Sequence, residues 1–178
     1  HAPNRHYAVT GVQTCALPNS LSVLDDARKR IRVTPGASAL VATMRAAGAY
    51  TALVSGGFRS FTGPVRSELG FDVDVANELL VSGAALSGAV QEPILDRDAK
   101  LATLRKLAAE HGLALAETMA VGDGANDLAM IEAAGLGIAY HAKASLRERA
   151  RHRIDHADLT ALLYVQGYRH SEIKRPPG

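Results

Sequence analysis

A length of 178 residues suits a single domain, and 47% hydrophobic with 21% charged residues is the composition of an ordinary globular protein rather than a disordered chain. The formal net charge of +2 is too small to provide an electrostatic footprint for nucleic acid, so we expect no nucleic-acid partner. The single cysteine, Cys15, excludes an internal disulfide framework, and no apolar run approaches the roughly 20 residues of a membrane helix, which together predict a cytoplasmic protein without a membrane partner.

Residues 1–19 differ from the rest of the chain because they show neither helical nor strand periodicity. The stretch VTGVQTCALP within them resembles a translated sequencing-library adapter. We therefore expect a non-native or disordered leader, the alternative being a short native leader or loop. In either case we expect no functional residue there.

From Ser20 onward helical and strand patterns alternate. The sequence predicts helices over 20–31, 37–48, 58–70, 98–111, from about 126, and over 145–150. It predicts strands over 50–55, 118–123 and 136–140, one strand within 71–81 and one over 86–90. An amphipathic segment over 158–168 follows them. This alternation favours an α/β fold with a doubly wound, mainly parallel sheet. Ligands of such sheets bind at the carboxyl ends of the strands, so we expect the site just after the strands over 50–55 and 118–123.

The densest group of polar residues is Gly122-Asp123-Gly124-Ala125-Asn126-Asp127, directly after a predicted strand. Glycines allow a sharp turn and a close approach to a ligand, and carboxylates bind hard cations such as Mg²⁺. The alternative is a turn in which Asp123 or Asn126 caps the next helix. Capping explains one polar residue and not three, so we favour metal or phosphate chemistry.

Two further features lie near the same predicted sheet edge. Ser55-Gly56-Gly57 offers a hydroxyl and unhindered amides beside a helix N-terminus, where phosphate binds readily, although a serine cap in a glycine turn explains the same residues. Lys100 lies near the start of a predicted helix, where a cation opposes the helix dipole. A solvated surface lysine is the common alternative for that position.

In this order, VSGGF, Lys100 and VGDGANDLAMI resemble the later motifs of phosphoserine phosphatases of the haloacid dehalogenase superfamily. Ala76-Asn77, Leu86-Ser87-Gly88, AAGLGIAYHAK and LLYVQGY extend the resemblance over about residues 20–168. The resemblance implies a Rossmann-like phosphatase core over 35–178 and a remnant of a helical cap over 20–34. It also implies hydrolysis of O-phospho-L-serine, in the last step of serine synthesis, through a phosphoaspartate intermediate.

The resemblance assigns roles to six residues. Ser55 and the Gly56 amide would bind phosphate oxygens, and Asn126 would help to hold the substrate. Lys100 would stabilise charge on the nucleophile and the phosphoryl group. The cofactor would be Mg²⁺, and Asp123 would ligate it. Asp127 would support the metal or Lys100.

The family's first motif, Asp-x-Asp-x-Thr/Ser, has no match before Ser55. Asp25-Asp26 lies in a charged helical context, and Asp72-Val73-Asp74 follows the SGG sequence and lacks the hydroxyl residue, so we reject both. Most of the helical cap is also missing, and we expect an N-terminally truncated, inactive chain. The alternatives are a phosphatase of the same superfamily for another small phosphomonoester, and a fragment without catalytic activity.

Overall fold

The structure is a computed structural model, and it describes residues 21–83, 85–95 and 97–175. The expected leader over 1–19 lies outside the described residues. Among those that are described, no helix combines the length and apolar character needed to cross a bilayer.

The first α/β unit, called the SGG unit, comprises residues 37–77. Its elements are α2 (Ala37–Ala46), β1 (Ala52–Phe58), α3 (Arg59–Leu69) and β2 (Val73–Asn77). β1 and β2 pair in parallel, with Ala52 opposite Val73, and α3 forms the crossover between them. The predicted helices over 37–48 and 58–70 are therefore confirmed to within two residues at each end.

Helix α1 (Ser22–Arg28) precedes this unit and has no buried residue. Its Arg28 Nε donates a hydrogen bond to the Ser60 carbonyl at 2.8 Å, which attaches α1 to the first turn of α3. The helix predicted over 20–31 is present but shorter. With no apolar face against the core, α1 depends on such polar contacts for its position.

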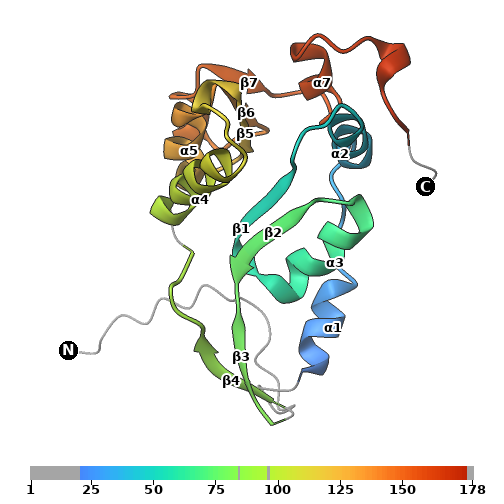
Figure 1. Cartoon of the computed structure of the whole chain (residues 1–178). Helices are drawn as coiled ribbons and strands as arrows, with labels where there is room; N and C mark the ends of the chain where they lie inside the picture. The colour runs from blue at the N-terminus through green and yellow to red at the C-terminus, as the bar shows by residue number, and fades with distance from the viewer. Residues whose placement is uncertain (1–20, 84, 96, 176–178) are drawn as a thin grey trace.

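A separate antiparallel pair, β3 (Leu79–Ser82) and β4 (Ala85–Val90), follows the SGG unit. Figure 1 shows this hairpin extending away from the parallel strands. The single strand predicted within residues 71–81 is wrong, because this stretch divides at Glu78 into β2 and β3, which belong to different sheets. No glycine or proline marks that division, so the sequence carries no turn signal for it.

The second α/β unit, called the GDG unit, comprises residues 97–154. It contains three parallel strands in the order β5 (Met119–Gly122), β6 (Leu136–Tyr140) and β7 (His152–Ile154). The helical elements are α4 (Arg97–Glu110), the 3₁₀ turns η1 (Leu115–Glu117) and η2 (Ala125–Asp127), α5 (Leu128–Ala133) and α6 (Ala144–Arg147). The strand over 136–140 has the predicted bounds, whereas β7 was not predicted.

The C-terminal segment contacts the turn immediately before the SGG unit. It contains α7 (Ala161–Val165) and η3 (His170–Glu172), and Figure 1 shows α7 close to α2. The Leu159 amide donates to the Pro35 carbonyl at 3.0 Å. Gly36 has φ 83° and a Cβ there would lie 2.7 Å from the Thr160 nitrogen, so both backbone conformation and space require glycine.

The α/β class and the parallel pairing are as predicted, but the parallel strands form two sheets. Within the described residues, β1 pairs with β2 alone and β5 pairs with β6 alone. Each of these two strands therefore has one edge without a strand partner in that part of the chain. The SGG sequence and the GDG sequence lie at the carboxyl ends of these same two strands.

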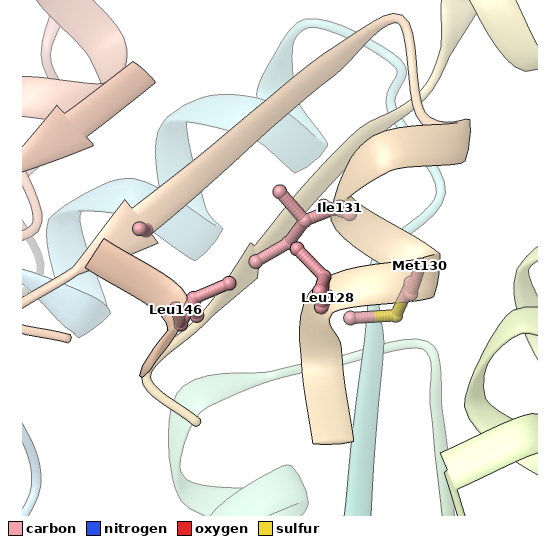
Figure 2. Packing of buried hydrophobic residues seen from close by; sticks show 6 residues of the cluster. Leu128, Met130, Ile131 and Leu146 are labelled. Atoms are coloured by element: carbon pink, nitrogen blue, oxygen red, sulfur yellow. The ribbon is translucent and has the colours of Figure 1, made fainter. Parts of the chain in front are cut away.

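The main apolar cluster belongs to the GDG unit. Figure 2 shows Leu128, Met130 and Ile131 of α5 near Leu146 of α6. Ala120 of β5 and Ala139 of β6 complete this cluster of buried residues. The strand that carries the GDG sequence is thus packed directly against the core.

Candidate active site

The SGG loop, residues Ser55–Gly57, occupies the end of β1. The Ser55 oxygen accepts a hydrogen bond from the Gly57 amide at 3.0 Å, which leaves the hydroxyl hydrogen free to be donated to a ligand. Gly56 and Gly57 are exposed, and α3 begins two residues after Gly57. The loop therefore combines a hydroxyl donor with the positive end of a helix dipole, as a phosphate site requires.

The GDG loop, residues 122–127, is organised around the buried carboxylate of Asp127, which is 4% exposed. Its Oδ2 accepts hydrogen bonds from the amides of Asp123 and Gly124, each at 3.2 Å. Because these amides precede the helix, Asp127 satisfies backbone donors of the turn. The capping considered for Asp123 or Asn126 is not observed, because the N-cap residues of η2 and α5 are Gly124 and Asp127 and neither makes a side-chain cap hydrogen bond.

Lys100 reaches the other oxygen of Asp127 from the first part of α4. Its Nζ donates to Asp127 Oδ1 at 2.5 Å, and Lys100 is 7% exposed. A buried ammonium group is costly unless it is paired, and here the pair also lets the carboxylate use both of its oxygens. The surface-lysine alternative is therefore wrong.

Gly122 is required by space rather than by backbone conformation. A Cβ at this position would overlap the side chain of Asp127. At Gly124 a Cβ would lie 2.7 Å from Oδ1 of Asn126. These two glycines permit the turn to close tightly around the Asp127 carboxylate.

The remaining predicted residues of this loop, Asp123 and Asn126, are exposed. The backbone carbonyl of Asp123 accepts from the Lys143 amide at 2.9 Å, which fixes the loop against the start of α6. Within the described part of the chain, the Asp123 carboxylate has no hydrogen bond or ion pair. It is consequently available to a ligand, unlike the carboxylate of Asp127.

The donor set fits Mg²⁺ with Asp123 as its carboxylate ligand. In the described residues no group of three or more His, Cys, Asp or Glu side chains is arranged to hold a metal. Mg²⁺ nevertheless commonly binds through one or two carboxylates and takes its other oxygen ligands from water and phosphate. Asp127 is already engaged by Lys100 and two amides, so of the two loop carboxylates it is Asp123 that could bind a cation directly.

One buried polar residue at the site, Asn77, had no predicted role. It ends β2, is 6% exposed, and donates from Nδ2 to the Gly56 carbonyl at 2.8 Å. Its Oδ1 accepts from the Leu95 amide at 2.6 Å, in the segment that leads into α4 and Lys100. A polar residue at the end of a strand-like run was the available signal, but the sequence did not specify its partners.

Among the open cavities in the described part of the chain are two near the ends of β2, and the larger of these lies away from this site. It has a volume of about 460 Å³ and is lined by Arg45, Arg66 and Asp72, which precedes β2. The smaller, of about 200 Å³, is lined by Asn77 together with Arg59 and Glu78, at the other end of β2. Neither cavity is lined by a residue of the SGG loop or of the GDG loop.

The chain is similar to proteins of known family. The model of the haloacid dehalogenase-like hydrolase family matches residues 15–132. A phosphoserine phosphatase of Mycobacterium tuberculosis is 41% identical over 153 residues, which are 86% of this chain and 37% of the relative. A phosphoserine phosphatase of Streptococcus thermophilus is 40% identical over 81% of this chain and 67% of its own.

Solved structures of phosphoserine phosphatases are also similar to this chain. A substrate-bound phosphoserine phosphatase complex aligns with a TM-score of 0.77 and 38% identity, covering 82% of this chain and 70% of that one. A phospho-aspartyl intermediate analogue of phosphoserine phosphatase aligns with a TM-score of 0.74 and 40% identity, covering 79% and 68%. The chain spans 37% of the length of its Mycobacterium tuberculosis and Streptomyces coelicolor relatives.

Proposed function

The chain belongs to the haloacid dehalogenase-like hydrolase family, and from this premise we propose that its residues form the phosphate- and cation-binding part of a phosphoserine phosphatase. The observation that carries the proposal is the buried Lys100–Asp127 pair, whose Asp127 shares a loop with the exposed Asp123. A structural ion pair alone does not explain an exposed carboxylate in the same loop, or the exposed Gly56 beside the Ser55 hydroxyl at the end of β1. Phosphoryl transfer needs these groups, because its catalysis is mostly positioning and charge stabilisation.

In this proposal the phosphate is held by neutral donors on one side. The Ser55 hydroxyl hydrogen and the Gly56 amide donate to phosphate oxygens, and Asn126 holds the substrate from the GDG loop. The Gly57 amide is already bonded to Ser55, so it keeps the hydroxyl oriented instead of binding the ligand directly. Hydrogen bonds to a charged oxygen are stronger than neutral ones, which favours this use of the loop.

The charged residues of the proposed site stabilise the negative charge of the phosphate and hold the cation. Lys100 stabilises negative charge on the phosphoryl group and on the attacking carboxylate, and Asp127 fixes its ammonium in place. Asp123 binds the divalent cation, which when present neutralises phosphate charge. Both charged groups of the Lys100–Asp127 pair are held before a ligand arrives, so little reorganisation is needed when it binds.

The proposed reaction begins with attack of an aspartate on phosphorus, and the 178-residue chain has no Asp-x-Asp-x-Thr/Ser sequence. We therefore expect this chain alone to bind phosphate with Mg²⁺ but to release none from O-phospho-L-serine. The test is a colorimetric phosphate-release assay on the purified chain, together with calorimetric titration of inorganic phosphate in the presence of Mg²⁺. Turnover that requires Mg²⁺ and disappears in Asp123→Ala would overturn the expected inactivity.

The binding part of the proposal has its own matched control. Asp123→Ala should abolish Mg²⁺-dependent phosphate binding, whereas Glu110→Ala, which removes an exposed carboxylate at the end of α4, should leave it unchanged. Equal binding by both variants would exclude Asp123 as the ligand. A phosphatase for a different small phosphomonoester is the second candidate, and turnover of several phosphomonoesters by an intact relative distinguishes it.

A further inference from the structure

We infer that Asn77 is a positioning residue that holds the SGG loop and the segment carrying Lys100 in a fixed relation. The inference rests on the proposed function, since it concerns the same phosphate site. The Asn77 amide bonds the Gly56 carbonyl on one side and the Leu95 amide on the other. Its two bonds therefore connect segments that are about forty residues apart in the sequence.

The orientation of the Asn77 amide is determined by its partners. A carbonyl can only accept and an N–H can only donate, so Nδ2 must face Gly56 and Oδ1 must face Leu95. The two segments are also in direct proximity, because a Cβ added at Gly56 would lie 3.7 Å from the Leu95 carbonyl oxygen. Asn77 is buried, so losing either bond would leave an unpaired polar group away from water.

The bond to Gly56 also controls the Ser55 hydroxyl. The Gly56 carbonyl and the Gly57 N–H belong to one planar trans peptide, so they point in opposite directions. Asn77 holds the carbonyl side of this peptide, and the N–H side donates to the Ser55 oxygen at 3.0 Å. Rotation of that peptide would break both bonds together, and the Ser55 hydroxyl would lose its fixed direction.

The bond to Leu95 acts on the other half of the site. Leu95 lies five residues before Lys100 and shortly before α4, which begins at Arg97. Fixing the Leu95 amide thus fixes the entry of the helix whose Lys100 pairs with Asp127. Within the described residues β1 and β5 do not pair, so Asn77 provides a side-chain link between the SGG loop and the segment that leads into α4.

Asn77→Asp separates the two bonds. The carboxylate can still accept from Leu95 but cannot donate to Gly56, whose carbonyl would then face a second acceptor. Asn77→Ala removes both bonds. Thr62→Val is the matched control, because it removes a buried 2.7 Å hydrogen bond to Asp74 on the same strand, outside the phosphate site.

The first measurement is titration of the full chain with inorganic phosphate and Mg²⁺. We expect Asn77→Asp to weaken phosphate affinity roughly tenfold, the ratio produced by loss of one oriented hydrogen bond, while Thr62→Val changes it less than about twofold. Unchanged affinity in Asn77→Asp, or an equal loss in Thr62→Val, would contradict the inference. No phosphate binding by the wild-type chain would instead reject the proposed function.

A second measurement needs no ligand. In amide hydrogen exchange followed by NMR, Asn77→Asp should reduce the protection of the Gly57 amide and preserve that of Leu95, whereas Asn77→Ala should reduce both. Thr62→Val should alter neither. Equal protection of Gly57 in the wild-type chain and Asn77→Asp would overturn the inference even if phosphate binding were never detected.

Discussion

In the GDG unit most buried residues are apolar, whereas in the SGG unit buried polar residues outnumber apolar ones. The buried apolar residues of the GDG unit are Ala108, Ala120, Leu128, Met130, Ile131, Ile138, Ala139 and Leu146, with Lys100 and Asp127 as its buried polar pair. Those of the SGG unit are only Ala37 and Val41, beside the polar Thr43, Thr62, Asp74 and Asn77.

This difference gives the two site loops different supports. The GDG loop follows a strand packed against a large apolar cluster, and apolar packing is non-directional. The SGG loop follows a strand whose residues are only half-buried or exposed, and it is oriented by Asn77 through directional bonds. We therefore expect the GDG unit to supply most of the stability and the SGG loop to be the more sensitive to single polar substitutions.

The largest expected effect tests whether the GDG unit depends on packing alone. Asp127→Ala should lower the free energy of unfolding by about 3–5 kcal/mol, because it leaves the buried Lys100 ammonium without its partner. Glu132→Ala, which removes the exposed pair with Arg149, should cost no more than about 1 kcal/mol. Urea denaturation measures both, and similar losses would mean that the buried pair contributes little.

The next comparison concerns the apolar residues of the two units. Leu146→Ala, at a fully buried position of the cluster in Figure 2, should cost about 2–5 kcal/mol. Leu53→Ala in β1 should cost clearly less, because Leu53 is only half-buried. Urea midpoints that fall equally in the two variants would remove the proposed difference between the units.

Two glycine substitutions provide the third comparison, because their expected effects on the free energy of unfolding have opposite signs. Gly122→Ala should destabilise the chain by about 1–3 kcal/mol, because the added methyl group would overlap Asp127. Gly63→Ala, inside α3, meets no atom within 4 Å and should stabilise by about 0.4–1 kcal/mol. Thermal unfolding of both variants is the measurement, and a stabilised Gly122→Ala would contradict the crowding at the GDG loop.

The smallest expected effect is a pH dependence of the SGG unit. Burial opposes ionisation of Asp72, but hydrogen bonds from the Thr51 amide and hydroxyl and the nearby Arg45 lower its pKa below the ordinary 3.8. A lowered pKa in the folded state contributes stability above the unfolded pKa, and this is lost as pH falls through the folded value. Asp72→Asn should thus cost about 1 kcal/mol at pH 7.

The control for this prediction is to compare the wild-type chain with Asp72→Asn at acid pH, where the wild-type carboxyl is protonated. As the pH falls below 3.8 and through the lower pKa of the folded state, protonation of the wild-type carboxyl should bring the two unfolding curves together. Urea denaturation across this range tests the sign. A difference that grows as the pH falls would show that Asp72 does not stabilise the fold through its charge.

Most of the elements could be predicted because apolar runs and glycine stops mark them. The strand over 136–140 and the helix ending before Gly48 are examples. β7 was missed because its sequence, His-Arg-Ile, is polar and too short for periodicity, and it forms a strand by pairing with β6. Tertiary context decided that segment, as it often does for short strands.

The sequence named candidate site residues but not their contacts. Glycine and carboxylate spacing singled out the GDG loop, and Ser55 was expected at the same sheet edge, whereas in the described residues β1 and β5 belong to different sheets. Burial of Lys100 against Asp127 depends on how α4 packs on η2, which no local pattern encodes. The same holds for Asn77, whose two partners lie in different segments.

The charges of the candidate site residues have a consequence for how ligands associate. Lys100 contributes one ammonium group, and Asp123 and Asp127 contribute two carboxylates, so the formal charge of these three residues sums to one negative charge. A phosphate dianion alone would be repelled, while a divalent cation alone would lack phosphate oxygens as ligands. Phosphate and cation should therefore bind with positive cooperativity, and thermodynamic reciprocity requires each to raise the affinity for the other by the same factor.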